Sequence, residues 1–270
     1  MWHHTADPQD TDQIKADYLT LKDLAKEICD LVETTHELER EIEHKGFPFY
    51  HYMVGLFLIN QLHYLEDLLS LIPNRTAELI ARTMVEGYIK LRWVEKDSEN
   101  RARSWFTFSW VQEWKYAKRQ ESRGYDVKEQ KQNILKHLDE DSRKHMNKKG
   151  ITALDNGAEP DPFKHFKHDW TGLSTFQLAE KTGLINLYAR YVDPISDWIH
   201  WSPKGFIKSA NTSEGGTKYT FKSYYQSVAS LIAGISSILG CLKIWDQVYD
   251  AGYFSKISKF EEKFNKWSPL

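Results

Sequence analysis

Three charged side chains, Arg82, Glu86 and Lys90, recur at intervals of four residues in a stretch that is otherwise mostly apolar. On an α-helix this spacing places them on one face, where neighbouring side chains can touch. A guanidinium group that a carboxylate holds in place is suited to binding phosphate, or to stabilising the negative charge that develops during phosphoryl transfer. The sequence therefore offers a candidate anion site built on one helix.

A second group of polar residues follows Pro194, which removes one helical hydrogen bond and predicts a kink. Ser196 and His200 are four residues apart and share a helix face. An imidazole has an ordinary pKa of about 6.5, so His200 could act as a general acid or base near neutral pH. The alternative is that His200 ends the helix and hydrogen-bonds a carbonyl of its last turn.

The two groups together define the candidate site. We expect the fold to bring Arg82, Glu86 and His200 together as catalytic residues. The expected binding residues are Ser196, Tyr191, Arg190 and Lys90. Such a site predicts a metal-independent reaction on RNA or nucleotides, in which His200 moves a proton and Arg82 stabilises the charged phosphorus centre.

Two other hypotheses account for the same residues. The site could bind a small ligand or a segment of a partner protein without turnover. Alternatively, Arg82 and Glu86 form a structural ion pair, which contributes about 0.3 to 0.5 kcal/mol when exposed and mainly packing specificity when buried. No cysteine and histidine cluster has zinc-site spacing, and His165 and His168 lack the further ligands that a divalent ion requires. We therefore expect no metal and no other cofactor.

Two long helices must organise the chain around these residues. Apolar side chains surround almost the whole circumference of the helix expected at about 74–95, which is typical of a helix enclosed by other helices. The second helix is expected at about 220–248 and contains an uncharged run from Ser223 to Leu242. Its serines and the lysines that close it at both ends make it a weak membrane span, so we predict a buried core helix.

The remaining chain is also predicted to be mostly helical. Only 8 Pro and 14 Gly occur in 270 residues, which fits long uninterrupted helices. We therefore predict an all-α fold, a single irregular bundle over 1–270 whose core covers about 50–250. Further helices are expected at about 11–44, 49–71, 97–123, 126–149, 174–182 and 184–199, with an irregular segment at 150–172, a Gly/Ser loop at 213–217 and an amphipathic tail at about 253–266.

The balance of 36 basic and 38 acidic residues implies no general attraction to nucleic acid or to anionic lipid. A local exception is the helix at 97–123, where aromatic residues alternate with arginines and lysines. This pattern fits a stacking surface for single-stranded nucleic acid, or an aromatic core under a solvated basic face. The surplus of apolar side chains on this helix and on the tail also predicts a homodimer.

The two cysteines, Cys29 and Cys241, lie among apolar residues and are expected to be buried free thiols. The first residues lack the basic and apolar regions of a secretory signal. We therefore expect a cytoplasmic protein that does not insert into a membrane.

Two separated segments resemble a known family. They are Arg82-x-x-x-Glu86-x-x-Ile89-x-Leu91 and, far downstream, Trp170-x-Gly172-x-Ser174 followed by Tyr191-x-x-x-x-Ser196-x-x-x-His200. In this order they resemble a bacterial helical family of unknown function, with an Arg/Glu pair on a central helix and a C-terminal Ser/His segment. The resemblance covers about 50–245 and implies that Arg82, Glu86, Ser196 and His200 are its site residues.

The chain is also loosely similar to HEPN domains, helical nucleotide-binding and RNA-cleaving domains that are common in bacterial toxins and antiphage systems. Their active pair is an arginine followed four to six residues later by a histidine, whereas nine residues separate Arg190 from His200. This similarity implies a toxin or antiphage-defence effector, in which Arg82 or Arg190 meets His200 through the fold.

Overall fold

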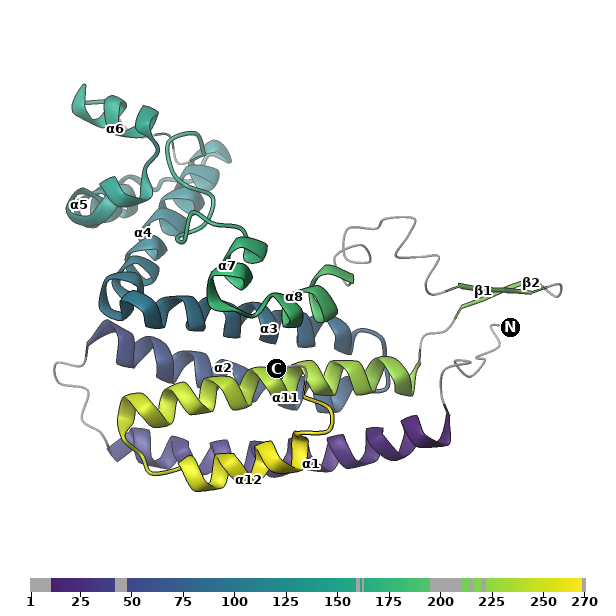
Figure 1. Cartoon of the computed structure of the whole chain (residues 1–270). Helices are drawn as coiled ribbons and strands as arrows, with labels where there is room; N and C mark the ends of the chain where they lie inside the picture. The colour runs from purple at the N-terminus through teal and green to yellow at the C-terminus, as the bar shows by residue number, and fades with distance from the viewer. Residues whose placement is uncertain are drawn as a thin grey trace. The chain divides into compact units, whose positions relative to one another are not determined.

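The computed structural model describes residues 11–41, 48–158, 161, 163–194, 210–213, 216–219 and 222–268. Most of them lie in helices, so the prediction of an all-α fold is confirmed (Figure 1). The chain folds into two compact units, Met1–Lys96 with Thr175–Leu270, and Asp97–Ser174. The expectation of a single domain stays a prediction, and each unit is described by itself.

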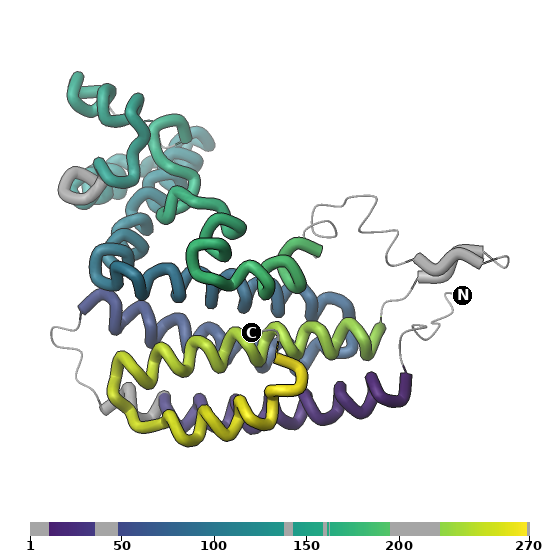
Figure 2. The backbone as a smooth tube through the Cα atoms, viewed as in Figure 1, coloured from purple at the N-terminus to yellow at the C-terminus, as the bar shows by residue number. Residues whose placement is uncertain are grey.

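Long helices packed along one another form the first unit. Its helices are α1 Asp12–Glu41, α2 Phe49–Leu71, α3 Ala77–Val94, α7 Thr175–Thr182, α8 Ile185–Tyr191, α11 Tyr224–Tyr249 and α12 Phe254–Phe264. The long helices agree with the sequence prediction to within about one turn. The chain folds back after α11, so that α12 lies against α11 and α1 (Figure 2).

The uncharged helix α11 is the centre of this unit, since it packs against α1, α2, α3, α8 and α12. Among the described residues it alone is long and apolar enough to cross a membrane, but 83% of its most apolar stretch is buried inside the protein. The hydroxyls of Ser227 and Ser237 donate to carbonyls four residues earlier, at 2.7 and 2.8 Å, and are thereby satisfied within the core. The prediction of a buried core helix is confirmed.

The helix α3 is enclosed as its sequence predicts. It packs against α2, α7, α8 and α11, and of its residues, all of them described, only Thr83 is exposed. Met84 shows how close the neighbours are, because a Cβ atom at Gly234 of α11 would lie 3.3 Å from its sulfur. On the other side, Gln61 Nε2 of α2 donates to the Met84 carbonyl at 2.8 Å.

Both cysteines are buried, as predicted, and neither forms a disulfide. Burial is the largest cause that raises the pKa of Cys29 to about 12, with the carboxylate of Glu66 as the next. The Cys29 thiol therefore keeps its proton at neutral pH and behaves as a small apolar side chain.

The second unit departs from the prediction after its first helix. It contains α4 Ser98–Ser122, α5 Lys128–Asp141, the 3-10 helix η2 Ser142–His145 and α6 Lys148–Asp155. The prediction of a single helix at 126–149 was wrong, because α5 ends at Asp141 and η2 follows it. His145, at the end of η2, is 1% exposed, and its Nε2 lies 2.9 Å from Thr107 Oγ1 of α4. A new helix, α6, then begins at Lys148, where the Asn147 side chain accepts a hydrogen bond from Gly150 N at 3.0 Å, and it continues to Asp155, into the segment expected to be irregular.

A two-stranded hairpin occupies the segment for which the sequence predicted a Gly/Ser loop. Its strands are β1 Ala210–Ser213 and β2 Gly216–Tyr219. They pair in antiparallel register, from Ala210 opposite Tyr219 to Ser213 opposite Gly216. Ser213, Gly216 and Thr217 of the predicted loop thus belong to paired strands.

Candidate functional site

The predicted pair of Arg82 and Glu86 is present on α3. Arg82 Nε donates a hydrogen bond to Glu86 Oε1 at 2.7 Å, one turn along the helix. The side chains are 18% and 28% exposed, so the pair lies at the edge of the core. At this depth the carboxylate orients the guanidinium and water still reaches both groups. Lys90, one turn further on, is half-buried as well.

The short helix α8 packs against α3 and brings Tyr188 near this pair. Burial is the largest cause that raises the pKa of Tyr188, and the negative charge of Asp193 raises this pKa further. The positive charge of Arg82 lowers the same pKa, and the negative charge of Glu86 raises it. Tyr188 therefore lies within electrostatic range of the other three side chains. We call these four residues, Arg82, Glu86, Tyr188 and Asp193, the α3–α8 cluster.

Sequence reasoning missed Tyr188 and Asp193. A signal for Tyr188 was present, because it lies four residues after Leu184 on the buried stripe of α8. Its ring meets the ring of Phe176 edge-on, with 5.7 Å between centroids, which fixes the phenol against α7. Asp193 is exposed and follows the last turn of α8, so nothing in the sequence distinguished it from an ordinary surface aspartate.

Two predicted binding residues, Tyr191 and Arg190, interact with each other. Burial raises the pKa of Tyr191, whereas the charge of Arg190 and the hydrogen bond that it donates to the hydroxyl lower it. Tyr225, at the start of α11, also acts on this hydroxyl. The pair thus extends the polar surface of α8 towards the N-terminal end of α11.

The predicted catalytic residue His200 and the predicted binding residue Ser196 lie outside the described residues. The described part of this segment ends at Pro194, one residue after Asp193 of the cluster. The meeting of His200 with Arg82 and Glu86 therefore stays a prediction, as does the kink at Pro194.

The aromatic helix α4 of the second unit was the other candidate surface. Its Phe108 and Trp114 are 4% and 0% exposed and belong to the core of that unit. The ammonium groups of Lys118 and Lys131 each lie 5.4 Å from the centre of the Trp114 ring. A buried ring in contact with two cations of its own chain offers no stacking face to a base. Core packing is therefore confirmed for this side of α4.

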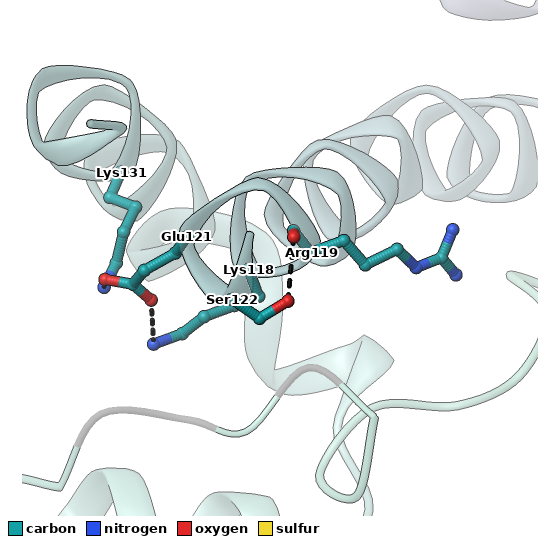
Figure 3. Close-up of polar contacts among 5 residues, drawn as sticks. All are labelled: Lys118, Arg119, Glu121, Ser122 and Lys131. Atoms are coloured by element: carbon teal, nitrogen blue, oxygen red, sulfur yellow. Dashed lines mark hydrogen bonds and ion pairs between the residues drawn. The ribbon is translucent and has the colours of Figure 1, made fainter. Parts of the chain in front are cut away.

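Glu121 joins the two lysines that flank Trp114 (Figure 3). Its carboxylate accepts hydrogen bonds from Lys131 at 2.9 Å and from Lys118 at 3.0 Å. The bond from Lys131 and then that from Lys118 are the main causes that lower the pKa of Glu121. The basic face of α4 thus carries its own anion here, which weakens its attraction for phosphate.

The surfaces expected to form a homodimer are partly used inside the protein. Phe264 of α12 is 4% exposed, whereas Phe254 of the same helix is 71% exposed. On α4 the exposed large aromatics are Phe106 and Tyr116. The homodimer stays a prediction.

No group of three or more His, Cys, Asp or Glu side chains that could hold a metal ion occurs in the described part of the chain. The ring of His165, which the sequence singled out, has a local structural role. Its Nδ1 accepts a hydrogen bond from the Asp161 backbone N–H at 3.0 Å and so stabilises a turn.

Comparison with known proteins gives one finding. No curated protein and no solved structure matches the chain. A family described as a family of unknown function, DUF5677, matches residues 58–217. This span runs from within α2 to β2 and includes the whole α3–α8 cluster. Because the match covers more than half of the 270 residues, the chain belongs to the DUF5677 family of unknown function.

Proposed function

We propose that this helical domain acts on RNA or nucleotides, and that it binds their phosphate groups at the α3–α8 cluster. The observation that supports the proposal is the oriented Arg82 guanidinium, hydrogen-bonded to Glu86 at 2.7 Å and 18% exposed. A planar guanidinium carries five N–H donors in a fixed fork that matches two oxygens of a phosphate group. Partial burial strengthens such a contact because water screens it less.

Tyr188 supports the same chemistry. Since its pKa is raised above the ordinary value of about 10, its hydroxyl is protonated at neutral pH and can donate a hydrogen bond to a phosphate oxygen. Lys90 places a further cation one turn beyond Glu86. When Lys90 is counted with the α3–α8 cluster, the cations of Lys90 and Arg82 balance the carboxylates of Glu86 and Asp193, so an anionic ligand meets side chains without net charge.

Turnover requires a group that transfers a proton, and His200 is assigned this role in the proposal. A histidine can accept the proton of an attacking hydroxyl and return one to the leaving oxygen near neutral pH. Arg82 then stabilises the charge on phosphorus without a metal ion. Cleavage of cellular or viral RNA by such a site would make the protein a toxin or an antiphage-defence effector.

Binding of a ligand or partner segment without turnover is the second candidate function. It is favoured by the protonation of Tyr188 and by the pairing of Arg82 with Glu86, since both arrangements suit recognition more than proton transfer. The two functions share the same residues on α3 and α8, and they differ in whether His200 is needed.

The test compares two arginines of one helix in the full-length protein. Arg82→Ala should weaken binding of a fluorescein-labelled RNA oligonucleotide, and of ATP, at least about tenfold by fluorescence anisotropy and calorimetry. Arg92→Ala is the control, because Arg92 of α3 also forms an ion pair, with Glu95 directly after the helix. Equal affinities for the two variants would contradict the proposed site.

His200→Ala separates the two functions. If the parent cleaves the labelled RNA, this variant should keep binding and lose cleavage, at unchanged circular dichroism. RNA or ATP binding that depends on Arg82, together with no cleavage by the parent, would establish the binding function instead.

A further inference from the structure

A pocket of about 470 Å³ lies in the first unit between α11 and α12, with one wall from α3. It is separate from the α3–α8 cluster, because Tyr88 and Glu86 are two residues apart on α3 and point to roughly opposite sides of that helix. Its lining includes Tyr88, Leu239, Gly240, Lys243, Glu261, Glu262 and Phe264. We call this space the α11–α12 pocket.

Gly240 of α11 allows Tyr88 to reach this pocket. A Cβ atom at position 240 would lie 2.3 Å from Cζ of the Tyr88 ring and 2.6 Å from its hydroxyl oxygen, so only glycine leaves room for the phenol. Tyr88 is 7% exposed, yet its side chain lines the pocket. Within the described part of the chain its hydroxyl has no hydrogen-bond partner, which is unusual for a tyrosine buried to this degree.

Charged groups at the pocket give it a negative balance. Lys243 of α11 and Glu261 of α12 form an ion pair across it, and Glu262 adds a second carboxylate. Burial raises the pKa of Tyr88 to about 12, Arg92 opposes this shift, and Glu261 is among the smaller causes that raise it. The Glu261 carboxylate therefore acts on the Tyr88 hydroxyl across the pocket.

We propose that the α11–α12 pocket binds a small organic cation, an ammonium group attached to an apolar body. The ammonium is placed between the Glu261 and Glu262 carboxylates and the Tyr88 oxygen, which accepts a hydrogen bond from it. Leu239 and the buried ring of Phe264 line the part of the pocket that takes the apolar body.

The test uses three probes of one shape and different charge, benzylamine, benzyl alcohol and benzoate, titrated into the full-length protein and followed by NMR chemical shifts. Benzylamine should bind at millimolar concentration, and benzyl alcohol and benzoate should bind at least about tenfold more weakly. Shifts should occur in the pocket residues of α11 and α12 and not in α8.

Two conservative variants connect the binding to the pocket. Tyr88→Phe removes only the hydroxyl, and Glu262→Gln removes one charge at nearly constant shape. Each should weaken benzylamine binding several-fold, while Lys259→Ala, on an exposed position of α12 outside the pocket, should leave it unchanged. Circular dichroism confirms that each variant is folded.

Three results would overturn the proposal. They are the failure of benzylamine to bind at millimolar concentration, equal or tighter binding of benzoate, and unchanged benzylamine affinity in both Tyr88→Phe and Glu262→Gln. Because these measurements involve neither Arg82 nor RNA, their failure leaves the function proposed for the α3–α8 cluster untouched.

Discussion

The two faces of α3 differ in what their side chains do. The face towards α11 carries Met84, Tyr88 and Leu91, which are 0%, 7% and 0% exposed, and it meets the glycines of α11 at close range. The opposite face carries Arg82 and Glu86, which remain partly exposed beside α8. One helix is thus both a wall of the core and a platform for polar groups.

This difference separates tightly packed apolar side chains from partly exposed polar ones on a single helix. On the closely packed α11 side, the addition or removal of a single methyl group should change the stability of the fold, because a protein interior has little free volume. The α8 side carries a partly exposed ion pair, whose net contribution to stability is small but whose charges can meet a ligand. Substitutions on the two faces should therefore have effects of different size and kind.

The largest effect is expected for Leu91→Ala on the α11 side. Leu91 is 0% exposed, and its truncation should lower the free energy of unfolding by about 2 to 5 kcal/mol. Urea denaturation followed by circular dichroism measures this loss. Thr83→Ala, at the exposed position of the same helix, should stay within about 0.5 kcal/mol. A loss of less than about 0.5 kcal/mol for Leu91→Ala would place Leu91 on the surface.

Gly240→Ala tests the contact between α11 and Tyr88. The added methyl would lie 2.3 Å from the Tyr88 ring, and such overpacking should cost about 1 to 3 kcal/mol. Gly87→Ala is the comparison with a milder contact, since its new Cβ would lie 3.0 Å from Nε2 of Gln61, a buried amide that donates to the Met84 carbonyl. If the cost arises from the phenol, Gly240→Ala should become nearly neutral in a Tyr88→Ala background. An unchanged cost in that background would assign it to another neighbour.

The Tyr88 hydroxyl predicts a loss of stability at high pH. Its folded pKa of about 12 exceeds the value of about 10 in an unfolded chain, so the folded protein holds this proton more tightly. The resulting stability is complete below about pH 10 and is lost as the pH rises to about 12, by about 2 kcal/mol. Urea unfolding should show this loss in the parent and a smaller one in Tyr88→Phe. Equal losses in the parent and in Tyr88→Phe would mean that the Tyr88 hydroxyl has the same pKa in the folded and the unfolded protein.

The fold was largely predictable because its signals are local. The apolar pattern of α3 and the uncharged run of α11 specify buried helices regardless of what surrounds them. The prediction failed at 126–155, where the chain bends because His145 reaches Thr107 of another helix. The Asn147 cap was visible in the sequence, but a run of charged residues on both sides of it masked the break.

The site was predictable only as far as one helix extends. Arg82 and Glu86 were found because a spacing of four residues guarantees their contact on a helix. Tyr188 comes within electrostatic range of the pair through the packing of α8 on α3, which depends on contacts between residues far apart in the sequence, and Asp193 acts on Tyr188. Tyr88 and Gly240 escaped notice for the same reason, because neither residue is unusual within its own helix.

The smallest effect on stability is expected at the Arg82–Glu86 pair itself. Its atoms are 2.7 Å apart and its side chains 18% and 28% exposed, so the coupling should lie between that of a surface pair and that of a sealed one, at about 0.5 to 1 kcal/mol. A double-mutant cycle with Arg82→Ala and Glu86→Ala measures it by urea denaturation. The same cycle on Arg92 and Glu95, 39% and 21% exposed, serves as the control and should give a similar value. A decrease of more than about 3 kcal/mol in the free energy of unfolding for Arg82→Ala alone would show that Glu86 is left as an uncompensated buried carboxylate. The face of α3 beside α8 would then belong to the core, as the face towards α11 does.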